Sequence, residues 1–258
     1  MKNMSIAMQV AVMFVAFALA GGAIAADTRD SGPLALVITY QTTPGNRAAL
    51  RQQMQSGELP QFQKWKDDGV LQDYRFLFSR YADSANWDMM ALLSFAKYAD
   101  LERWRQIEQT NPAGLSPKAL ALTTSIITVP VDLSRSQKLF RGRDSVFMVI
   151  PYHYLIPTGD YLSYVDSYVV PQIEGWMDEG VLAGFGLYLV RYTADRPWES
   201  LLVLEYTNDQ GLGAREAVVA KVRNRLKDNP KWKAISDSKK EVRVEKQAVI
   251  ADALVSSP

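Results

Sequence analysis

The segment at 60–71, PQFQKWKDDGVL, occurs a second time in altered form at 171–182 as PQIEGWMDEGVL. The two segments lie 111 positions apart, and both carry Pro, Trp and Gly at the same places before ending in Val-Leu. Self-similarity at a fixed offset is the sequence signature of a duplicated structural unit. The chain is therefore predicted to contain one fold twice.

The same register extends on both sides of this segment. The further matches at the offset of 111 are Arg80-Tyr81 with Arg191-Tyr192, and Trp87 with Trp198. Upstream, Val37-Ile38-Thr39-Tyr40 matches Val149-Ile150-Pro151-Tyr152 at an offset of 112, a change of one residue in the following loop. Two tryptophans and several polar residues held in register are not expected by chance.

Each half shows the order strand, helix, strand, strand, helix, strand. In the first half these elements are expected at 34–42, 46–67, 74–81, 88–95, 100–109 and 125–131. In the second half they are expected at 145–154, 160–178, 184–193, 199–206, 213–227 and 241–250. Pro60 predicts a kink or short break in the first helix, because proline removes a helical hydrogen bond. Gly69 stands where a C-cap residue belongs.

The βαββαβ order is that of the ferredoxin-like motif. Strand segments such as 147–150 are apolar throughout rather than alternating, so both faces of each sheet need cover. We therefore predict an α+β fold in which two tandem ferredoxin-like βαββαβ repeats pack sheet to sheet as a pseudo-dimeric α/β barrel. The first repeat is expected at 33–133, a basic linker at 134–143 and the second repeat at 144–254.

This order of elements resembles the dimeric α/β-barrel superfamily, as does a helix that ends in Trp-x-x-x-Gly-Val-Leu and leads into a strand with Arg-Tyr. Within that superfamily, the chain is most similar to NIPSNAP-like, antibiotic-biosynthesis-monooxygenase-like and EthD-like proteins. The resemblance is found once in each half and so covers nearly the whole mature chain, but it is a likeness of fold alone. We recognise no catalytic motif of these groups, so the resemblance implies no particular activity.

The N-terminus has the features of a signal peptide. Lys2 precedes an apolar run at 6–20, and Ala23-Ile24-Ala25 has the small-x-small form of a cleavage site. We expect residues 1–25 to be removed and the mature protein to be periplasmic or secreted. An uncleaved anchor is the alternative, although the apolar run is short for a membrane span.

Composition excludes several classes of function. Loss of residues 1–25 removes one lysine and lowers the formal charge from +1 to about zero, so the chain lacks the basic surface expected of a nucleic-acid or anionic-membrane binder. The sequence has no cysteine, which excludes disulfides and thiolate chemistry. Nucleophile-elbow, phosphate-loop, dinucleotide and His-Glu-x-x-His motifs are missing from the sequence. We predict no metal site.

His153 and the repeated arginines are the first candidate site residues. His153 is the only histidine, and it aligns with Gln41 of the first half. A histidine can titrate near neutral pH and a glutamine cannot, so the needs of a fold shared by both halves do not explain His153. It is a candidate general base or haem ligand. Arg80 and Arg191 are candidate anion-binding residues, since a buried arginine needs a carboxylate, a carbonyl or an anionic ligand. Their structural alternative is an ion pair with one of three acidic residues, namely Asp67, Asp178 or Glu199.

Tyr40 and Tyr152 are candidate ligand-binding residues, with Tyr152 also a candidate catalytic acid or base; the alternative is that both fill the barrel. Trp65 and Trp176 are predicted core residues. The adjacent acids Asp67-Asp68 and Asp178-Glu179 are predicted to be solvated turn residues, because neighbours in sequence do not face each other on a helix. The face of the strand that carries His153 is preferred over the Tyr152 face as the one bordering the cavity.

Three functions remain open from the sequence. The first is binding of a small, mainly apolar molecule in the barrel cavity, without a cofactor. The second is a cofactor-independent monooxygenase or isomerase that uses His153 or Tyr152. The third is a haem-binding or purely structural protein. A monomer is expected to suffice, because the second copy replaces a partner subunit, and further dimerisation is left open.

Overall fold

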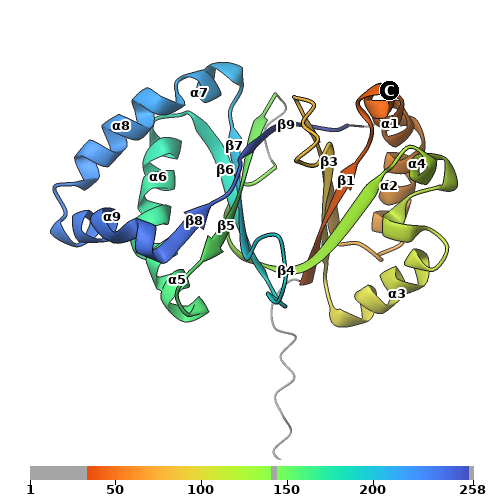
Figure 1. Ribbon diagram of the computed structural model, residues 1–258, viewed down its shortest axis with the longest axis horizontal. Helices are drawn as coiled ribbons and strands as arrows, with labels where there is room; N and C mark the ends of the chain where they lie inside the picture. Colours follow the sequence, from red (N-terminus) through yellow and green to blue (C-terminus); the bar gives the residue numbers. More distant parts are fainter. Residues whose placement is uncertain (1–33, 141–143, 256–258) are drawn as a thin grey trace, which may run out of the picture.

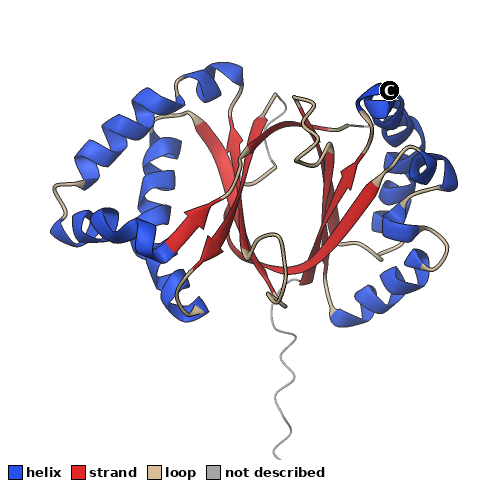
Figure 2. Ribbon diagram, viewed as in Figure 1, coloured by secondary structure: helices blue, strands red, loops and turns tan. Residues whose placement is uncertain are grey.

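The computed structural model describes residues 34–140 and 144–255, so the signal peptide expected at 1–25 lies outside the described residues. Two groups of antiparallel strands face each other in the middle of the molecule, and helices cover the outer side of each group (Figures 1 and 2). The mixed α+β class predicted from the sequence is confirmed.

The first half contains four strands and a layer of helices. Its strands are β1 (Leu34–Gln41), β2 (Asp73–Ser79), β3 (Met89–Phe95) and β4 (Ser125–Gln137). Its longer helical segments are α1 (Arg47–Gln53), the π-helical η2 (Met54–Glu58), α2 (Leu59–Asp67), α3 (Tyr98–Glu108) and α4 (Pro117–Ala121). Two single turns, η1 (Pro44–Asn46) and η3 (Pro112–Gly114), complete it.

The second half repeats this plan with additions near its end. Its strands are β5 (Val146–Tyr154), β6 (Leu182–Val190), β7 (Ser200–Tyr206), β8 (Arg243–Glu245) and β9 (Val249–Ala253). Its helices are α5 (Thr158–Tyr164), the π-helical η4 (Val165–Val169), α6 (Val170–Asp178), α7 (Asp209–Gly213), α8 (Arg215–Leu226) and α9 (Pro230–Val242).

The strands close into an eight-stranded antiparallel barrel. Their order is β7-β6-β4-β1-β3-β2-β9-β5, and β5 pairs again with β7 to close the ring. The short β8 continues the edge of β5 beyond β9. Within the first half the order is β4-β1-β3-β2, and within the second half it is β9-β5-β7-β6, which places corresponding strands in the same order.

The last strand of each half crosses into the sheet of the other half. β4 pairs with β1 up to Asp132 and with β6 from Val131 onward. β9 pairs with β5 of its own half and with β2 of the first half. These two crossings hold the halves together as one barrel.

Three apolar cores follow from this arrangement. One lies between the first sheet and its helices, around Phe62 and Trp104. A second occupies the equivalent place in the second half, around Tyr161 and Trp176. The third lies between the two sheets inside the barrel, and includes Val37, Leu92, Val129, Phe147 and Val203. The strands are apolar on both faces because each face borders a core.

The helix that contains Pro60 is not broken. Its π-helical segment η2 ends just before Pro60, which falls in the first turn of α2, where a missing N–H costs no hydrogen bond. The backbone N–H of Leu59 bonds to the carbonyl of Met54, one residue further back than in an α-helix. Gly69 and its equivalent Gly180 follow these helices with φ of 68° and 76°, in line with the predicted C-cap position.

The segment expected to be a linker begins as a strand. The first four residues of 134–143 belong to β4, and Ser136 and Gln137 lie opposite Gly186 and Phe185 of β6. These polar residues lie at the exposed rim of the barrel and form a strand through backbone hydrogen bonds. A search for apolar strand patterns therefore does not detect them.

The strand expected at 241–250 is also different. A thirteen-residue helix, α9, extends to Val242, and only β8 and β9 are extended after it. The side chain of Asn229 accepts hydrogen bonds from the backbone N–H groups of Lys231 and Trp232, and Pro230 opens the helix. A Pro that follows a helical pattern commonly marks the end of a helix, whereas Asn229-Pro230 begins one here.

Candidate functional site

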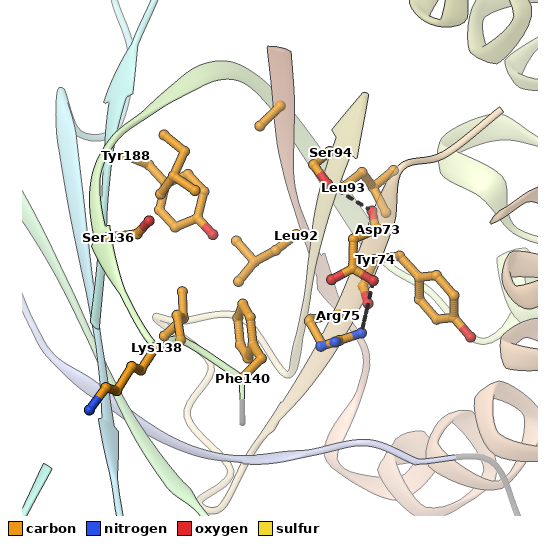
Figure 3. A pocket seen from close by; sticks show the side chains of 13 residues that line it. Asp73, Tyr74, Arg75, Leu92, Leu93, Ser94, Ser136, Lys138, Phe140 and Tyr188 are labelled. Carbon is orange, nitrogen blue, oxygen red and sulfur yellow. Dashed lines mark hydrogen bonds and ion pairs between the residues drawn. The ribbon is translucent and has the colours of Figure 1, made fainter. Parts of the chain in front are cut away.

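Two cavities lie at opposite ends of the barrel, with the inter-sheet core between them. One is lined by residues near the start of β1 and the other by residues near its end. The smaller, which we call the Tyr188 cavity, has a volume of about 270 Å³ and is shown in Figure 3. The larger, of about 430 Å³, we call the tryptophan cavity.

The Tyr188 cavity is mainly apolar on one side and polar on the other. Leu92, Phe140 and Tyr188 face its middle, whereas the amino group of Lys138 points away (Figure 3). On the polar side, Arg75 Nη1 donates to Asp73 Oδ1 at 3.0 Å. Burial raises the pKa of Tyr188, so its hydroxyl stays protonated near neutral pH.

The tryptophan cavity is built from corresponding residues of both halves. Its walls include Trp87 with its repeat equivalent Trp198, and Met90 with its equivalent Leu201. Thr39 and its equivalent Pro151 also line it. The cavity therefore lies where the two halves of the chain meet, and neither half forms it alone.

Gln41 is held beside the tryptophan cavity by the loop between β2 and β3. Its Nε2 donates to the carbonyl oxygens of Ser84 at 3.1 Å and Asn86 at 2.7 Å. The exposed side chains of Lys246 and Gln247 add polar groups at the rim. The cavity thus combines aromatic and aliphatic walls with a few polar groups, as ligand pockets commonly do.

His153 lies beside the barrel rather than in a cavity. It shares the barrel-facing side of β5 with Phe147 and Val149, so the His153 face, and not the Tyr152 face, borders the interior. Its Nδ1 is 3.8 Å from Glu199 Oε2, and its side chain is 32% exposed. His153 does not line any of the cavities described here, while its equivalent Gln41 does.

Arg80 and Arg191 form equivalent ion pairs where the strands cross. Arg80 Nε donates to Asp252 Oδ1 of β9 at 2.8 Å, and its guanidinium also contacts Asp209. Arg191 Nε donates to Asp132 Oδ1 of β4 at 2.8 Å. Each arginine therefore binds the strand that arrives from the other half. The partners expected from sequence, Asp67, Asp178 and Glu199, were wrong, because strand crossing could not be foreseen.

The two candidate tyrosines face the helices and not the barrel interior. Tyr40 is fully buried and its hydroxyl donates to the carbonyl oxygen of Ala113 at 2.8 Å. Tyr152 is buried on the equivalent face of β5, with its hydroxyl 3.5 Å from Glu245 Oε2. Burial raises the pKa of both hydroxyls. The prediction that Trp65 and Trp176 are core residues is confirmed, with exposed fractions of 8% and 7%.

A third cavity, the Arg243 pocket, lies between β5, η4 and α9 and has a volume of about 440 Å³. The Arg243 guanidinium lies 3.9 Å from the centre of the Tyr152 ring and 5.4 Å from that of Tyr164. Tyr168 also lines the pocket. Sequence reasoning singled out only Tyr152 here. The signal that it missed is tyrosine at 161, 164 and 168, a spacing that places all three on one side of a helix.

The paired acids at the helix ends make surface ion pairs. Lys64 Nζ lies 2.5 Å from Asp68 Oδ2, and Lys221 Nζ lies 2.6 Å from Glu179 Oε2. Across the described part of the chain, no group of three or more histidine or acidic side chains is placed to hold a metal ion. Within the same residues, no helix is both long and apolar enough to cross a membrane.

Comparison with known proteins shows the fold and no more. No family model matches the chain, and no curated protein matches it. Among solved structures, a candidate monooxygenase from Fusobacterium nucleatum is 13% identical with a TM-score of 0.53, covering 86% of this chain and 93% of its own.

Two further structures are similar to the same extent. An anthrone oxidase-like protein is 13% identical with a TM-score of 0.50, covering 87% of this chain and 92% of its own. A haem-binding protein from Thermus thermophilus is 11% identical with a TM-score of 0.50, covering 86% of this chain and 91% of its own. The chain therefore shares the α/β-barrel fold of these three structures.

Proposed function

We propose that the protein binds a small, mainly apolar molecule in the tryptophan cavity. The observation that carries this proposal is the meeting of Trp87 and Trp198, equivalent residues of the two repeats, in one cavity of about 430 Å³. Aromatic walls supply a large apolar contact area, and the few polar groups at the rim orient a ligand.

Binding of the neutral fluorophore N-phenyl-1-naphthylamine tests this proposal. Trp87→Ala and Trp198→Ala should each weaken binding about fivefold, as expected for loss of about 1 kcal/mol of aromatic contact. Ile127→Trp, which adds bulk at the open rim of the cavity, should abolish binding. Ile127 is 43% exposed, so this change is compatible with folding.

Tyr81→Ala and Tyr192→Ala are the matched controls. These residues form another repeat pair, are 71% and 63% exposed, and do not line the cavity. Both control variants should bind the fluorophore as the unchanged protein does. Equal affinity in all five variants would contradict a site at the tryptophans.

A cofactor-independent monooxygenase or isomerase is the second candidate function. Neighbours described as a candidate monooxygenase and as anthrone oxidase-like support it at the level of fold. In this chain His153 Nδ1 lies 3.8 Å from Glu199 Oε2 beside the barrel, the only contact of a histidine with a carboxylate among the described residues. Oxygen uptake with anthrone, lost in His153→Gln, would support this function; no uptake with the unchanged protein would count against it.

A haem cofactor is the third possibility, supported by the neighbour described as haem-binding. Haem iron is held in proteins by His, Cys or Tyr, or by Met together with His. The sequence has no cysteine, its single histidine does not line the cavities described here, and Met90 of the tryptophan cavity therefore has no histidine beside it. Burial raises the pKa of Tyr152 and Tyr164, which disfavours the tyrosinate that iron needs. These residues do not fit a haem, and added haemin should give no saturable Soret shift.

Four further proposals concern the whole chain. We propose that its halves are tandem ferredoxin-like repeats, which their equal strand order supports. We propose that it is related to NIPSNAP-like, antibiotic-biosynthesis-monooxygenase-like or EthD-like proteins. We propose that a monomer is sufficient, because the barrel closes within one chain, with further dimerisation left open. We propose export with cleavage after Ala25, which the N-terminal pattern supports. N-terminal sequencing of the exported protein should return Ala26, and Met1 would refute cleavage.

A further inference from the structure

The Arg243 pocket contains a partly buried cation for which the protein itself supplies no acidic partner. Arg243 begins β8 directly after α9; its guanidinium has a hydrogen bond to the neutral Tyr161 hydroxyl, while its Nη1 is buried with no hydrogen-bond partner. Among residues 34–140 and 144–255, no carboxylate forms an ion pair with it. A buried charge without a counter-ion is costly, so such a group points to a ligand that carries the opposite charge.

The charges around the pocket also favour an anion. Four cationic side chains line it, Arg223, Lys239, Lys240 and Arg243, against one acidic side chain, Glu245. Arg223 Nε is held at 2.8 Å by Gln172 Oε1, a neutral partner. Glu245 lies 3.5 Å from the hydroxyl of Tyr152, and its side chain is exposed.

Two tyrosine hydroxyls in the same pocket are available as donors. The hydroxyls of Tyr164 and Tyr168 are buried and have no hydrogen-bond partner. An unpaired buried hydroxyl costs free energy, since it has lost its bonds to water. Together with Nη1 of Arg243, they place three unused donor groups around one cavity, beside the aromatic faces of the tyrosines.

The first half shows that the fold does not require this arrangement. The positions equivalent to Tyr164 and Tyr168 are Gln53 and Gly57. Gln53 Nε2 donates to Glu58 Oε1 at 3.0 Å, so its polar group is satisfied within the protein. The helix after Asn111-Pro112 is the five-residue α4, and the first half has no counterpart of α9 with its lysines.

We propose that the Arg243 pocket binds a small organic carboxylate, with the carboxylate on the Arg243 guanidinium and the tyrosine hydroxyls and the apolar body against the tyrosine rings. A guanidinium binds a carboxylate in a bidentate geometry. Inorganic phosphate can match the guanidinium in the same way, but it has no apolar body to place against the tyrosine rings, and a neutral alcohol carries no charge. This site is separate from the tryptophan cavity and does not depend on the function proposed for it.

Isothermal titration of the full chain with benzoate, benzyl alcohol and inorganic phosphate tests the proposal. Benzoate should bind. Benzyl alcohol, which lacks the charge, should bind at least about tenfold more weakly, the factor expected for one charge-assisted hydrogen bond, and phosphate, which lacks the ring, should also bind more weakly than benzoate. Arg243→Gln should weaken benzoate binding by about tenfold or more, and Arg243→Lys by less. Tyr164→Phe should weaken it several-fold without lowering the melting temperature, because that hydroxyl bonds no protein group.

Controls separate this site from general effects of charge and from the tryptophan cavity. Arg225→Gln removes a neighbouring arginine of α8 that is 55% exposed and does not line the pocket, and should bind benzoate unchanged. Trp87→Ala should also leave benzoate affinity unchanged. Without added anion, Arg243→Gln should melt no lower than the unchanged protein, a result that a structural arginine would not give.

Three results would overturn the proposal: no benzoate binding to the unchanged protein, equal binding by Arg243→Gln, or tighter binding of phosphate than of benzoate. If Arg243→Gln melts lower without anion and Tyr164→Phe binds benzoate normally, Arg243 is a structural residue and the proposal also fails.

Discussion

The helical layers of the two halves are built in a similar way, but they differ in whether their buried polar groups have hydrogen-bond partners. In the first half, Tyr40 bonds to Ala113, and Glu58 accepts hydrogen bonds from both Gln53 and the backbone N–H of Ser116. In the second half, Arg243 Nη1 and the hydroxyls of Tyr164 and Tyr168 are buried without partners.

This difference separates what the fold needs from what it does not. Both halves need a buried tryptophan, a glycine turn and a strand-crossing ion pair, and both have them. Unpaired buried groups weaken a fold, so the three that gather at the Arg243 pocket call for a reason outside the fold. The carboxylate that we propose would satisfy these three groups.

The largest expected effect concerns the shared tryptophans. Trp65→Ala and Trp176→Ala should each lower the free energy of unfolding by roughly 3–5 kcal/mol, as for other large buried aromatics. Substitution by Phe should cost less at 176 than at 65, because Trp176 Nε1 is buried without a partner. Urea denaturation of the four variants measures this. Unchanged midpoints for both Ala variants would show that the halves do not depend on these side chains.

The strand-crossing ion pairs should give the next largest effect. Arg80→Gln and Arg191→Gln should each destabilise by about 1 kcal/mol, because both arginines are largely shielded while their partners are partly exposed. A double-mutant cycle of Arg80 with Asp252 isolates one pair, and a cycle of Arg191 with Asp132 isolates the other. Zero coupling at one crossing and not the other would show that the crossings are not equivalent.

A third contact between the two halves should make the free energy of unfolding depend on pH, whereas the equivalent contact should not. Arg135 of β4 holds Asp166 of η4 at 2.7 Å and lowers the pKa of that carboxyl. The equivalent residue, Gln55, bonds to the carbonyl of Val255 and does not titrate.

Because the folded pKa of Asp166 is lowered, its contribution is complete above the unfolded pKa of about 3.9 and is lost as pH falls through the folded value. Both side chains are more than a third exposed, so the contribution is about 0.2–1 kcal/mol. Asp166→Asn should flatten the acid side of a plot of stability against pH by this amount, while Gln55→Ala leaves its slope unchanged. An unaltered slope in Asp166→Asn would contradict the assignment.

The smallest expected effect is at His153. His153→Gln gives the second half the residue that the first half has at this place, and should leave fluorophore and benzoate binding unchanged. His153 touches neither cavity, and its nearest charged partner is 3.8 Å away. A measurable loss of either affinity would show that this difference between the halves matters for binding.

The barrel was predictable because two patterns agreed. The offset between the segments at 60–71 and 171–182 indicated duplication, and strands apolar on both faces indicated cover on both sides. The extension of β4 to Gln137 and the helix α9 were not predicted. Backbone pairing at a polar rim leaves no apolar pattern, and Asn229-Pro230 is compatible with either end of a helix.

The candidate sites were predictable only in part. The match of Trp87 with Trp198 was visible, but not that both would line one cavity, because that depends on how the sheets face each other. The sequence did not predict Arg243 as a site residue. What distinguishes this arginine is that its buried Nη1 has no hydrogen-bond partner, which only the folded structure shows. Composition and spacing describe which groups are present, and packing alone decides which remain unsatisfied.

The pairing of β9 with β2 determines when the barrel can close during folding. Leu77 lies opposite Ala253, near the end of the chain. Until β9 is in place, β2 and β5 have a free edge where the ring should close, and the core between the sheets is open along that seam. Contacts so distant in sequence are reached late and slowly during folding. The strand β9 thus closes the barrel. A chain truncated before Val249 should have exposed strand edges and should therefore aggregate.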